Sequence, residues 1–433
     1  MATIKPARCL NFTFLRPRAA GSCRSSSRPL GAASVRHKSG PYGYTQAKAL
    51  VFSKPGEPSD VLRHVCPNSS PLLVLLHNHS ISPQIPSHSV LVRTLAAPVN
   101  PADVNTVQGT YGAKPSYDKS IGTSEPSSIP GNEGCLEVLS VGSAVSGLQK
   151  GDWCIPASTG FGTWRTHALV ENADAALLKV DKTGLDPIQV ATVSVNPCSA
   201  YRMLRDYVDL IGQSVKAFQT DSSATGGAWF IQNGANSGVG RAAIQLGRLW
   251  GLRSINVIRE REDQTATEQL RRELLDLGAT AVVTEAEFLD RSFTARLRDE
   301  FTRGGKDPVT LGLNCVGGKS ATAMAKCLSE SGTLVTYGAM SKQPVMLPTG
   351  LLIFKDLRFH GFWLSRWANA DRAGKKSTVD EILGLIREGK FRDAPVQEVE
   401  WNWQTEEATL REAVQGTLQG FRAGKGVFVF GDA

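Results

Sequence analysis

Short apolar runs alternate with longer helix-like stretches in the second half of the chain. The predicted strands are 229–231, 254–258, 281–283, 310–314, 333–337 and 357–359. Apolar residues at helical spacing fill the segments between them. This alternation is typical of a doubly wound α/β sheet, and its six strands suffice for a complete dinucleotide-binding domain.

The first half of the chain has a different pattern. Between residues 47 and 195 the apolar runs are short, β-branched and separated by Gly and Pro, and examples are 48–52, 89–95 and 135–141. This pattern predicts a partly open β-barrel. Two stretches, 68–82 and 213–227, interrupt the pattern and are interpreted as loop insertions. The apolar centre of the first suits a surface loop or a lipid-facing flap.

The end of the chain is predicted to return to the β-rich part. From about residue 366 it contains a helical stretch, 379–388, and then apolar runs between 391 and 430. We therefore predict a β-rich domain made of 45–200 and 366–433. The predicted dinucleotide-binding domain comprises 201–365.

The first 44 residues differ in composition from the rest. They contain eight basic residues and no acidic one: Lys5, Arg8, Arg16, Arg18, Arg24, Arg28, Arg36 and Lys38. Basic, Ser-rich and acid-free segments are typical of mitochondrial transit peptides, so the mitochondrial matrix is the predicted location. A basic tail that stays on the mature protein is the alternative. The whole chain and this segment both carry a charge of +8, so the remainder is near neutral and its charge does not favour nucleic acid.

Cysteine spacing and apolar run length restrict the class of protein further. The eight cysteines are scattered, with no Cys-x-x-Cys pair, which is typical of a protein from a reducing compartment. No apolar stretch approaches the roughly 20 residues that a membrane-spanning helix needs. We expect no membrane span.

A glycine-rich turn is the first candidate for binding chemistry. The apolar run 229–231 is followed by Gln232-Asn233-Gly234-Ala235-Asn236-Ser237-Gly238-Val239-Gly240 and then by a helical pattern. A strand, a glycine-rich turn and a helix N-terminus together form a site for the pyrophosphate of a dinucleotide. The spacing departs from the usual G-x-G-x-x-G, so a plain strand-to-helix turn is the alternative.

The next predicted strand ends in Arg259-Glu260-Arg261, about 20 residues after the turn. This is where the fold places the residue that contacts the adenosine ribose. A carboxylate there selects NAD, whereas two guanidiniums suit a 2′-phosphate. The predicted cofactor is therefore NADPH, with solvated arginines as the alternative.

Several further motifs occur in one order along the chain. They are residues 99–105 (Val-Asn-Pro-Ala-Asp-Val-Asn), 108–112 (Gln-Gly-Thr-Tyr-Gly), 131–134 (Gly-Asn-Glu-Gly), 150–152 (Lys-Gly-Asp), 162–165, 195–202, 314–318, 336–340, 354–356 and 361–365. With them the chain resembles the medium-chain dehydrogenase/reductases, and among these the zinc-free mitochondrial trans-2-enoyl-thioester reductases. The resemblance implies a GroES-like catalytic domain, a Rossmann domain, and NADPH-dependent reduction of enoyl-CoA or enoyl-acyl-carrier-protein in fatty acid synthesis. It also implies a homodimer through the edge of the Rossmann sheet.

The proposed reaction requires a proton donor but no metal. Zinc-dependent relatives use thiolate and imidazole ligands, whereas Asn100 follows Val99 here and the turn at Asn132-Glu133 has no His. Hydride addition to an enoyl thioester leaves an enolate, which needs a hydrogen-bond donor and then a proton. By resemblance the donor is Tyr111, because a phenol stays protonated at neutral pH yet can release its proton. A tyrosine that only packs between glycines is the alternative.

The resemblance implies roles for the remaining candidate residues. Asn196 is expected near the nicotinamide ribose and Lys425 at the tail side of the cofactor. The pyrophosphate is expected on Asn236, Ser237, Gly238 and Val239, and the ribose phosphate at Arg259, Glu260 and Arg261. The nicotinamide end is expected against Tyr337, Gly338, Ala339, Met340, Phe362, Trp363, Leu364 and Ser365. A helix-capping role for Asn196 and core packing for Tyr337 and Trp363 are the alternatives.

Two other functions compete with this prediction. A quinone reductase of the same superfamily would share the fold and NADPH but would not need Tyr111. A non-enzymatic NADPH-binding regulator is the second, since fold alone does not imply activity. The chain also departs from the family pattern at Leu136, expected to tighten the wall beside the cofactor, and at Ala339, where Gly is common.

Overall fold

The structure is a computed structural model of the 433-residue chain. It describes residues 45–64, 79–82, 84–214, 227–419 and 424–431. The predicted transit peptide, most of the 68–82 insertion and nearly all of the 213–227 insertion lie outside these ranges. Within these ranges, none of the helices has the length and apolarity needed to cross a bilayer.

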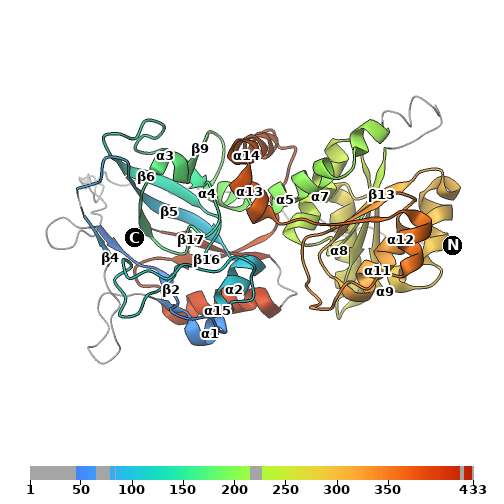
Figure 1. Cartoon of the computed structure of the whole chain (residues 1–433), viewed down its shortest axis with the longest axis horizontal. Helices are drawn as coiled ribbons and strands as arrows, with labels where there is room; N and C mark the ends of the chain where they lie inside the picture. The colour runs from blue at the N-terminus through green and yellow to red at the C-terminus, as the bar shows by residue number, and fades with distance from the viewer. Residues whose placement is uncertain (1–44, 65–78, 83, 215–226, 420–423, 432–433) are drawn as a thin grey trace, which may run out of the picture. The chain divides into compact units, whose positions relative to one another are not determined.

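A seven-stranded sheet forms the β-rich part (Figure 1). Its order is β16-β17-β5-β6-β7-β9, and β8 also pairs with β5. The strands before the tail are β5 (Val90–Pro98), β6 (Cys135–Val141), β7 (Trp153–Pro156), β8 (His167–Val170) and β9 (Leu177–Val180). Two small sheets pair β1 (Thr45–Ala47) with β4 (His79–Ile81) and β2 (Leu50–Val51) with β3 (Arg63–His64). Strand β4 therefore accounts for the last residues of the predicted 68–82 insertion.

Of the five helices described in this part of the chain, four have a proline in the first turn and the one at Ala173–Ala176 does not. They are α1 (Pro58–Val61), α2 (Pro101–Val107), α3 (Ala173–Ala176), α4 (Pro187–Thr192) and α5 (Asn196–Asp206). Proline suits the first helical turn because its missing N–H is not needed there. In α2, a capping box joins Asn100 and Asp103, which fixes the direction in which the chain leaves β5.

The tail adds two strands to this first sheet. Its elements are α13 (Leu364–Ala370), α14 (Arg372–Arg387), β16 (Val396–Trp401), α15 (Glu407–Gln419) and β17 (Lys425–Phe430). Strand β17 runs antiparallel to β5, with Val427 opposite Pro98, and Val99 N–H donates to the carbonyl of Gly426 at 2.9 Å. This register brings Lys425 beside Asn100, which lies more than 300 residues earlier in the chain.

A six-stranded parallel sheet has the order β12-β11-β10-β13-β14-β15. Its strands are β10 (Trp229–Asn233), β11 (Arg253–Ile258), β12 (Ala281–Thr284), β13 (Val309–Asn314), β14 (Thr333–Thr336) and β15 (Arg358–Gly361). The connecting elements are α7 (Gly238–Leu249), α8 (Gln264–Leu277), α9 (Glu285–Leu289), α10 (Phe293–Arg296), a π-helical turn (Leu297–Phe301), a 3-10 turn (Arg303–Gly305), α11 (Gly318–Cys327) and α12 (Thr349–Lys355). The strand order reverses at β10, where doubly wound sheets bind their ligands.

Both faces of the parallel sheet are buried. Phe230 packs in one core cluster with α5 and α7 residues, whereas Trp229 and Ile231 pack in a second cluster with α11 residues. Side chains of a strand alternate between faces, so burial on both sides produces the continuous apolar run seen in the sequence.

The predicted fold class is confirmed, and each predicted strand of the parallel sheet is present with bounds shifted by at most a few residues. One detail was wrong. Leu136 points into the core of the β-rich part, where it packs with Val92, Val138 and Cys154 and not against the candidate site.

Candidate functional site

The glycine-rich turn joins β10 to α7. Gly234 has a φ of +61°, and a Cβ there would lie 2.6 Å from the sulfur of Cys315. Ser237 caps the helix by accepting a hydrogen bond from Gly240 N–H at 3.1 Å. A Cβ on Gly240 would lie 2.5 Å from the carbonyl oxygen of Ala235. Glycine therefore lets α7 start close against the turn, with its N-terminal N–H groups at the carboxyl edge of the sheet.

The tip of β11 carries the predicted phosphate-binding arginines. Arg259 and Glu260 are exposed, and Arg261 is partly buried. The backbone N–H of Arg261 donates to Thr267 Oγ1 at 2.8 Å, which fixes the loop to the first turns of α8. Burial lowers the pKa of Arg261, and the positive charges of Arg259 and Arg241 lower it further.

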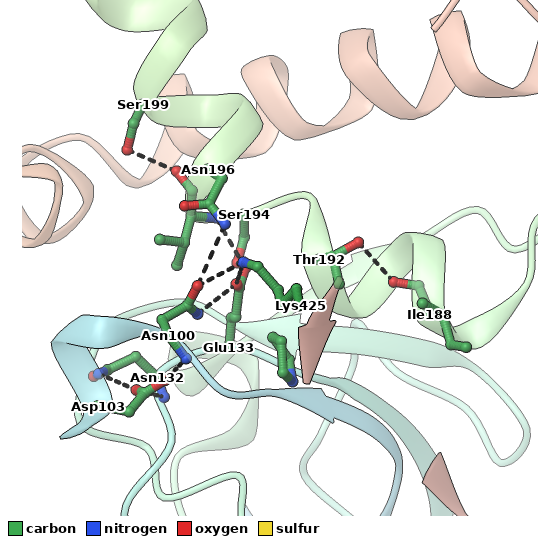
Figure 2. Close-up of polar contacts among 12 residues, drawn as sticks. Asn100, Asp103, Asn132, Glu133, Ile188, Thr192, Ser194, Asn196, Ser199 and Lys425 are labelled. Atoms are coloured by element: carbon green, nitrogen blue, oxygen red, sulfur yellow. Dashed lines mark hydrogen bonds and ion pairs between the residues drawn. The ribbon is translucent and has the colours of Figure 1, made fainter. Parts of the chain in front are cut away.

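A buried polar network lies between the start of α2, the start of α5 and the start of β17 (Figure 2). Asn100 is its centre: its Nδ2 donates to Glu133 Oε1 at 2.8 Å, and its Oδ1 accepts from Lys425 Nζ at 2.6 Å. Asn196 Nδ2 donates to the same Oδ1 at 3.3 Å. Helix α5 begins at Asn196 and its N-cap is Val195, so the side chain of Asn196 does not cap the helix.

Burial shifts the pKa of every charged group in this network. It raises the pKa of Glu133, although Lys425 and hydrogen bonds from Asn100, Ser194 and Val195 oppose the shift. It lowers the pKa of Lys425, against the attraction of Glu133 and Asp103. The two charges lie 3.9 Å apart at their closest atoms, so the cation and the carboxylate compensate each other in a largely buried site.

Asp103 forms a second layer of the network. Its carboxylate accepts from the backbone N–H of Asn100 at 2.8 Å, and from the N–H and Nδ2 of Asn132 at 3.0 and 2.6 Å. Burial raises the pKa of Asp103 to about 7, the hydrogen bond from Asn100 opposes this shift, and the charge of Glu133 adds to it. The carboxylate joins α2 to the turn at 131–134 and so holds Asn100 and Glu133 in one arrangement.

The donor set of this network is unsuited to zinc. The described residues contain no group of three or more His, Cys, Asp or Glu side chains that could hold a metal ion. Asn100 and Asn132 offer amides, and the Lys425 ammonium already lies against Asn100 Oδ1 and Glu133. Zinc prefers thiolate, imidazole and carboxylate ligands.

Tyr111 lies in the turn after α2, where its backbone N–H donates to the carbonyl of Asn105 at 3.1 Å. Trp363 Nε1 donates to Tyr111 Oη at 2.9 Å, and Ser365 Oγ lies 3.3 Å from the same oxygen. The two rings are T-shaped, with centroids 6.2 Å apart. A Cβ on Gly112 would lie 3.7 Å from the Trp363 ring, at ordinary van der Waals distance, so the loop passes directly beside the indole. Trp363 is 37% exposed and is therefore not a core aromatic.

The segment after β14 separates into buried and exposed residues. Tyr337 packs against the core, and its N–H donates to the carbonyl of Asn314 at 2.9 Å. Its hydroxyl lies close to Cys315 and Ser237 yet forms no hydrogen bond within the part of the chain described here, and burial raises its pKa well above the usual value. Gly338 packs against Cys315. Ala339 and Met340 are exposed, the latter by 64%.

The predicted site residues fall into separate groups in the structure. Asn196 and Lys425 share the Asn100 network, and a Cβ on Gly238 would lie 2.9 Å from Asn196 Nδ2. These three residues also line a narrow cleft beside α7. Tyr111, Trp363 and Ser365 form a second group, while Phe362 and Leu364 pack against the core cluster.

Sequence reasoning missed two groups of polar residues at this site. Asn100 and Glu133 were considered only as positions that lack a zinc ligand, and Arg241 was given no role. The available signal for Asn100 was a polar residue two positions after the end of a long buried strand. Nothing comparable marked Arg241, because an arginine in a helix is usually solvated.

Comparison with known proteins identifies the family. Residues 86–182 match the alcohol dehydrogenase GroES-like domain, and residues 238–379 match the zinc-binding dehydrogenase family. The mitochondrial enoyl-[acyl-carrier-protein] reductase of Yarrowia lipolytica is 45% identical over 81% of this chain and 82% of its own length. The human protein of the same description is 41% identical over 80% of each chain. The chain belongs to the mitochondrial enoyl-[acyl-carrier-protein] reductase family.

Solved structures agree with this membership. A mutant enoyl thioester reductase from Candida tropicalis matches with a TM-score of 0.76 and 37% identity, covering 89% of this chain and 99% of that one. A complex of Etr1p with NADP and crotonyl-CoA matches with a TM-score of 0.75, the same identity and the same coverage. A quinone reductase from Bacillus thuringiensis, at 23% identity and a TM-score of 0.64, shares the fold. The metal named in one domain description finds no suitable ligands in the network around Asn100.

Proposed function

We propose that the protein reduces trans-2-enoyl thioesters to acyl thioesters with NADPH in the mitochondrial matrix, as part of fatty acid synthesis. Relatives at 37 to 45% identity are named mitochondrial enoyl-[acyl-carrier-protein] reductases, and a solved relative was captured with NADP and crotonyl-CoA. The observation that carries the proposal is the hydrogen bond from Trp363 to Tyr111. It gives the phenol a defined direction in which to release its proton.

The residues around the turn fit NADPH. Helix α7 presents its N-terminal N–H groups beside Asn236, Ser237, Gly238 and Val239, which suits a pyrophosphate. A side chain at Gly238 would collide with Asn196, so the backbone stays open to a close ligand. The Tyr337 hydroxyl, buried and unbonded among the described residues, offers a hydrogen bond in the same crevice. We assign the ribose phosphate to Arg259, Glu260 and Arg261.

The network around Asn100 holds two further side chains in position to contact the cofactor. Asn100 holds Asn196 and Lys425 through one oxygen, so the two side chains cannot move independently. Lys425 thereby keeps a charged donor at the tail side of the site, and Asn196 keeps its amide oxygen available as an acceptor for a ribose hydroxyl. Tyr337, Gly338, Ala339, Met340, Phe362, Trp363, Leu364 and Ser365 are assigned to the nicotinamide end.

Bound NADPH supplies a hydride to the β-carbon of the enoyl thioester. The chain then stabilises and protonates the thioester enolate. The indole N–H of Trp363 can only donate, so Tyr111 Oη accepts there and its own hydrogen points elsewhere. We assign that hydrogen to the enolate, with Ser365 as its partner before substrate binds. As the proton leaves, the Trp363 N–H stabilises the negative charge that develops on the Tyr111 oxygen.

Steady-state kinetics of the purified protein test this assignment. With trans-2-hexenoyl-CoA we expect turnover that prefers NADPH over NADH and falls about 100-fold or more in Tyr111→Phe, as for loss of a general acid. The phenylalanine ring preserves the packing against Trp363, so NADPH affinity should stay unchanged. Equal activity of the variant and the parent would remove Tyr111 from the mechanism.

The same experiment separates the two alternative functions. A quinone reductase of this fold would reduce a quinone, leave enoyl-CoA unreacted and tolerate Tyr111→Phe. A non-enzymatic regulator would bind NADPH and turn over neither acceptor. Intact Tyr111, Trp363 and Ser365 contacts favour the enoyl reductase over both.

A homodimer is the proposed assembly. Helix α12, which leads into the edge strand β15, exposes Phe354 by 82% and Ile353 by 66%, and Met346 just before this helix is 63% exposed. Apolar exposure of this extent at a sheet edge is typical of a protein interface. A structural relative is described as an Etr1p/Etr2p heterodimer. Enoyl-CoA and enoyl-acyl-carrier-protein are the proposed substrates.

Two proposals concern the organisation of the chain. Residues 1–44 are proposed as the transit peptide, in line with relatives named mitochondrial. The catalytic domain is proposed to comprise 45–200 and 366–433, and the NADPH-binding domain 201–365. The two family matches, 86–182 and 238–379, support this order of domains.

A further inference from the structure

Arg241 is a nearly buried arginine near the start of α7, directly behind the glycine-rich turn. Its side chain is only 10% exposed. Nε donates to the carbonyl oxygen of Asn236 at 3.2 Å, and Nη1 donates to Glu273 Oε1 of α8 at 2.7 Å. The guanidinium therefore joins the turn that begins the cofactor site to the helix that follows β11.

The charge of Arg241 reaches the tip of β11. Arg261 responds to two nearby positive charges, Arg259 beside it in sequence and Arg241 from α7, and both lower its pKa. Such an effect requires proximity, because Coulomb interactions weaken with distance and solvent exposure. The backbone also joins the two segments, because Ala235 N–H in the turn donates to the carbonyl of Val257 near the end of β11 at 3.1 Å. The Arg241 side chain, bonded to the same turn, therefore lies on the side of the crevice where Arg259 and Arg261 follow β11, which suits a ligand with two negative charges at a single group.

Glu273 has the opposite effect on an anionic ligand, since its negative charge opposes the positive charge of these arginines. It is 46% exposed, and the hydrogen bond from Arg241 lowers its pKa. The pair therefore joins a nearly buried guanidinium to a half-exposed carboxylate, which fixes the position of Arg241 and offsets part of its charge.

We propose that Arg241 determines cofactor specificity by adding a third positive charge for the 2′-phosphate of the dinucleotide, and that Glu273 limits the effect. This inference rests on the proposed use of NADPH. A bracing role for Arg241 on the turn is the competing explanation. The two explanations predict different results. If the pair braces the turn, substitution of either residue weakens cofactor binding. If charge decides, substitution of Arg241 weakens NADPH binding and substitution of Glu273 strengthens it.

Titration of the full-length protein with NADPH and with NADH, followed by nicotinamide fluorescence, tests the proposal. Arg241→Gln should raise the Kd for NADPH about tenfold, the size expected for one charge-assisted contact, and leave the Kd for NADH within about twofold. Glu273→Gln should lower the Kd for NADPH by about two- to threefold, with NADH again unaffected. Arg241→Lys keeps the charge and should restore the Kd for NADPH to within about threefold of the parent.

Arg248→Gln is the matched control, because Arg248 is an exposed arginine two helical turns further along α7. It removes the same charge and should leave both Kd values unchanged. Weaker binding of both cofactors in Arg241→Gln and Glu273→Gln would overturn the proposal and assign Arg241 to bracing. A parent protein that does not prefer NADPH over NADH would instead overturn the proposed cofactor, and the inference with it.

Discussion

At Tyr111, one neighbouring atom decides which way a hydrogen bond runs. An indole N–H has no lone pair to offer, so the 2.9 Å contact from Trp363 must end on the phenol oxygen. A serine in the place of Trp363 could donate or accept, and the phenol hydrogen would then have two possible directions. The tryptophan removes that choice and adds a partial positive charge where negative charge develops.

Trp363→Phe should therefore lower kcat with enoyl-CoA by about tenfold, because it keeps an aromatic ring against Tyr111 but removes the donor. NADPH affinity should change little. In a Tyr111→Phe background the same substitution should cost almost nothing further, since the two groups act as a unit.

Trp367→Phe is the control for this prediction. Trp367 belongs to the same segment but packs against Arg202, not against Tyr111. It should leave kcat unchanged in both backgrounds. Additive losses from Trp363→Phe and Tyr111→Phe would contradict a shared role in proton transfer.

The position of a site residue was predictable where a local sequence pattern determines it. Arg259 and Arg261 follow a predicted strand, so their neighbourhood can be inferred from the chain itself, whereas the role of Tyr111 was predicted from the resemblance. Lys425 was assigned only by resemblance, because its partner Asn100 depends on the pairing of β17 with β5. Arg241 could not be assigned at all, since its role depends on Glu273 from another helix.

Among the elements, β10, the turn and α7 were the easiest to predict. The strand is buried on both faces and the helix is capped by Ser237, so local sequence and final structure agree. The short elements of the β-rich part were harder. Strand β2 has two residues and α2 has seven, and their bounds depend on tertiary contacts such as the hydrogen bond between Asn132 and Asp103.

Helix α2 carries a pH-dependent contribution to stability through Asp103. Its pKa is about 7 in the folded protein and 3.8 for an ordinary aspartate. The folded state therefore binds the proton more tightly than the unfolded state between these values. The contribution of Asp103 is favourable below about pH 4, declines as pH rises through this window and is constant above about pH 7. The full shift corresponds to about 4 kcal/mol at most.

Urea unfolding of the parent and of Asp103→Asn between pH 4.5 and 8 checks this prediction. The free energy of unfolding of the parent, relative to the variant, should fall as pH rises towards 7. Asp118→Asn is the control: hydrogen bonds from Ser120 lower the pKa of this exposed carboxylate, so its difference from the parent should stay flat between pH 5 and 8. A flat difference for Asp103→Asn as well would contradict the raised pKa.

For the whole molecule, the tail of the chain contributes both to the first sheet and to the candidate site. Strands β16 and β17 complete a sheet whose other strands lie between residues 90 and 180, and β17 delivers Lys425 to the site. The sequence pattern predicted the return of the tail but not its register. Register depends on which backbone groups pair, and the one observed here sets Gly426 against Val99.

The proposed dimer gives the last prediction. Phe354 is 82% exposed in the single chain, next to Ile353 and near the edge strand β15. Covering these side chains with a second copy would remove apolar surface from water, and a charge placed there would have to be buried without a partner. Phe354→Glu should therefore shift the mass measured by light scattering from dimer to monomer at micromolar concentration, with an unchanged circular dichroism spectrum. Leu249→Glu, at a 38% exposed site on α7, should leave the mass unchanged. A parent protein that is monomeric, or a Phe354→Glu variant that stays dimeric, would show that this apolar edge is not the interface.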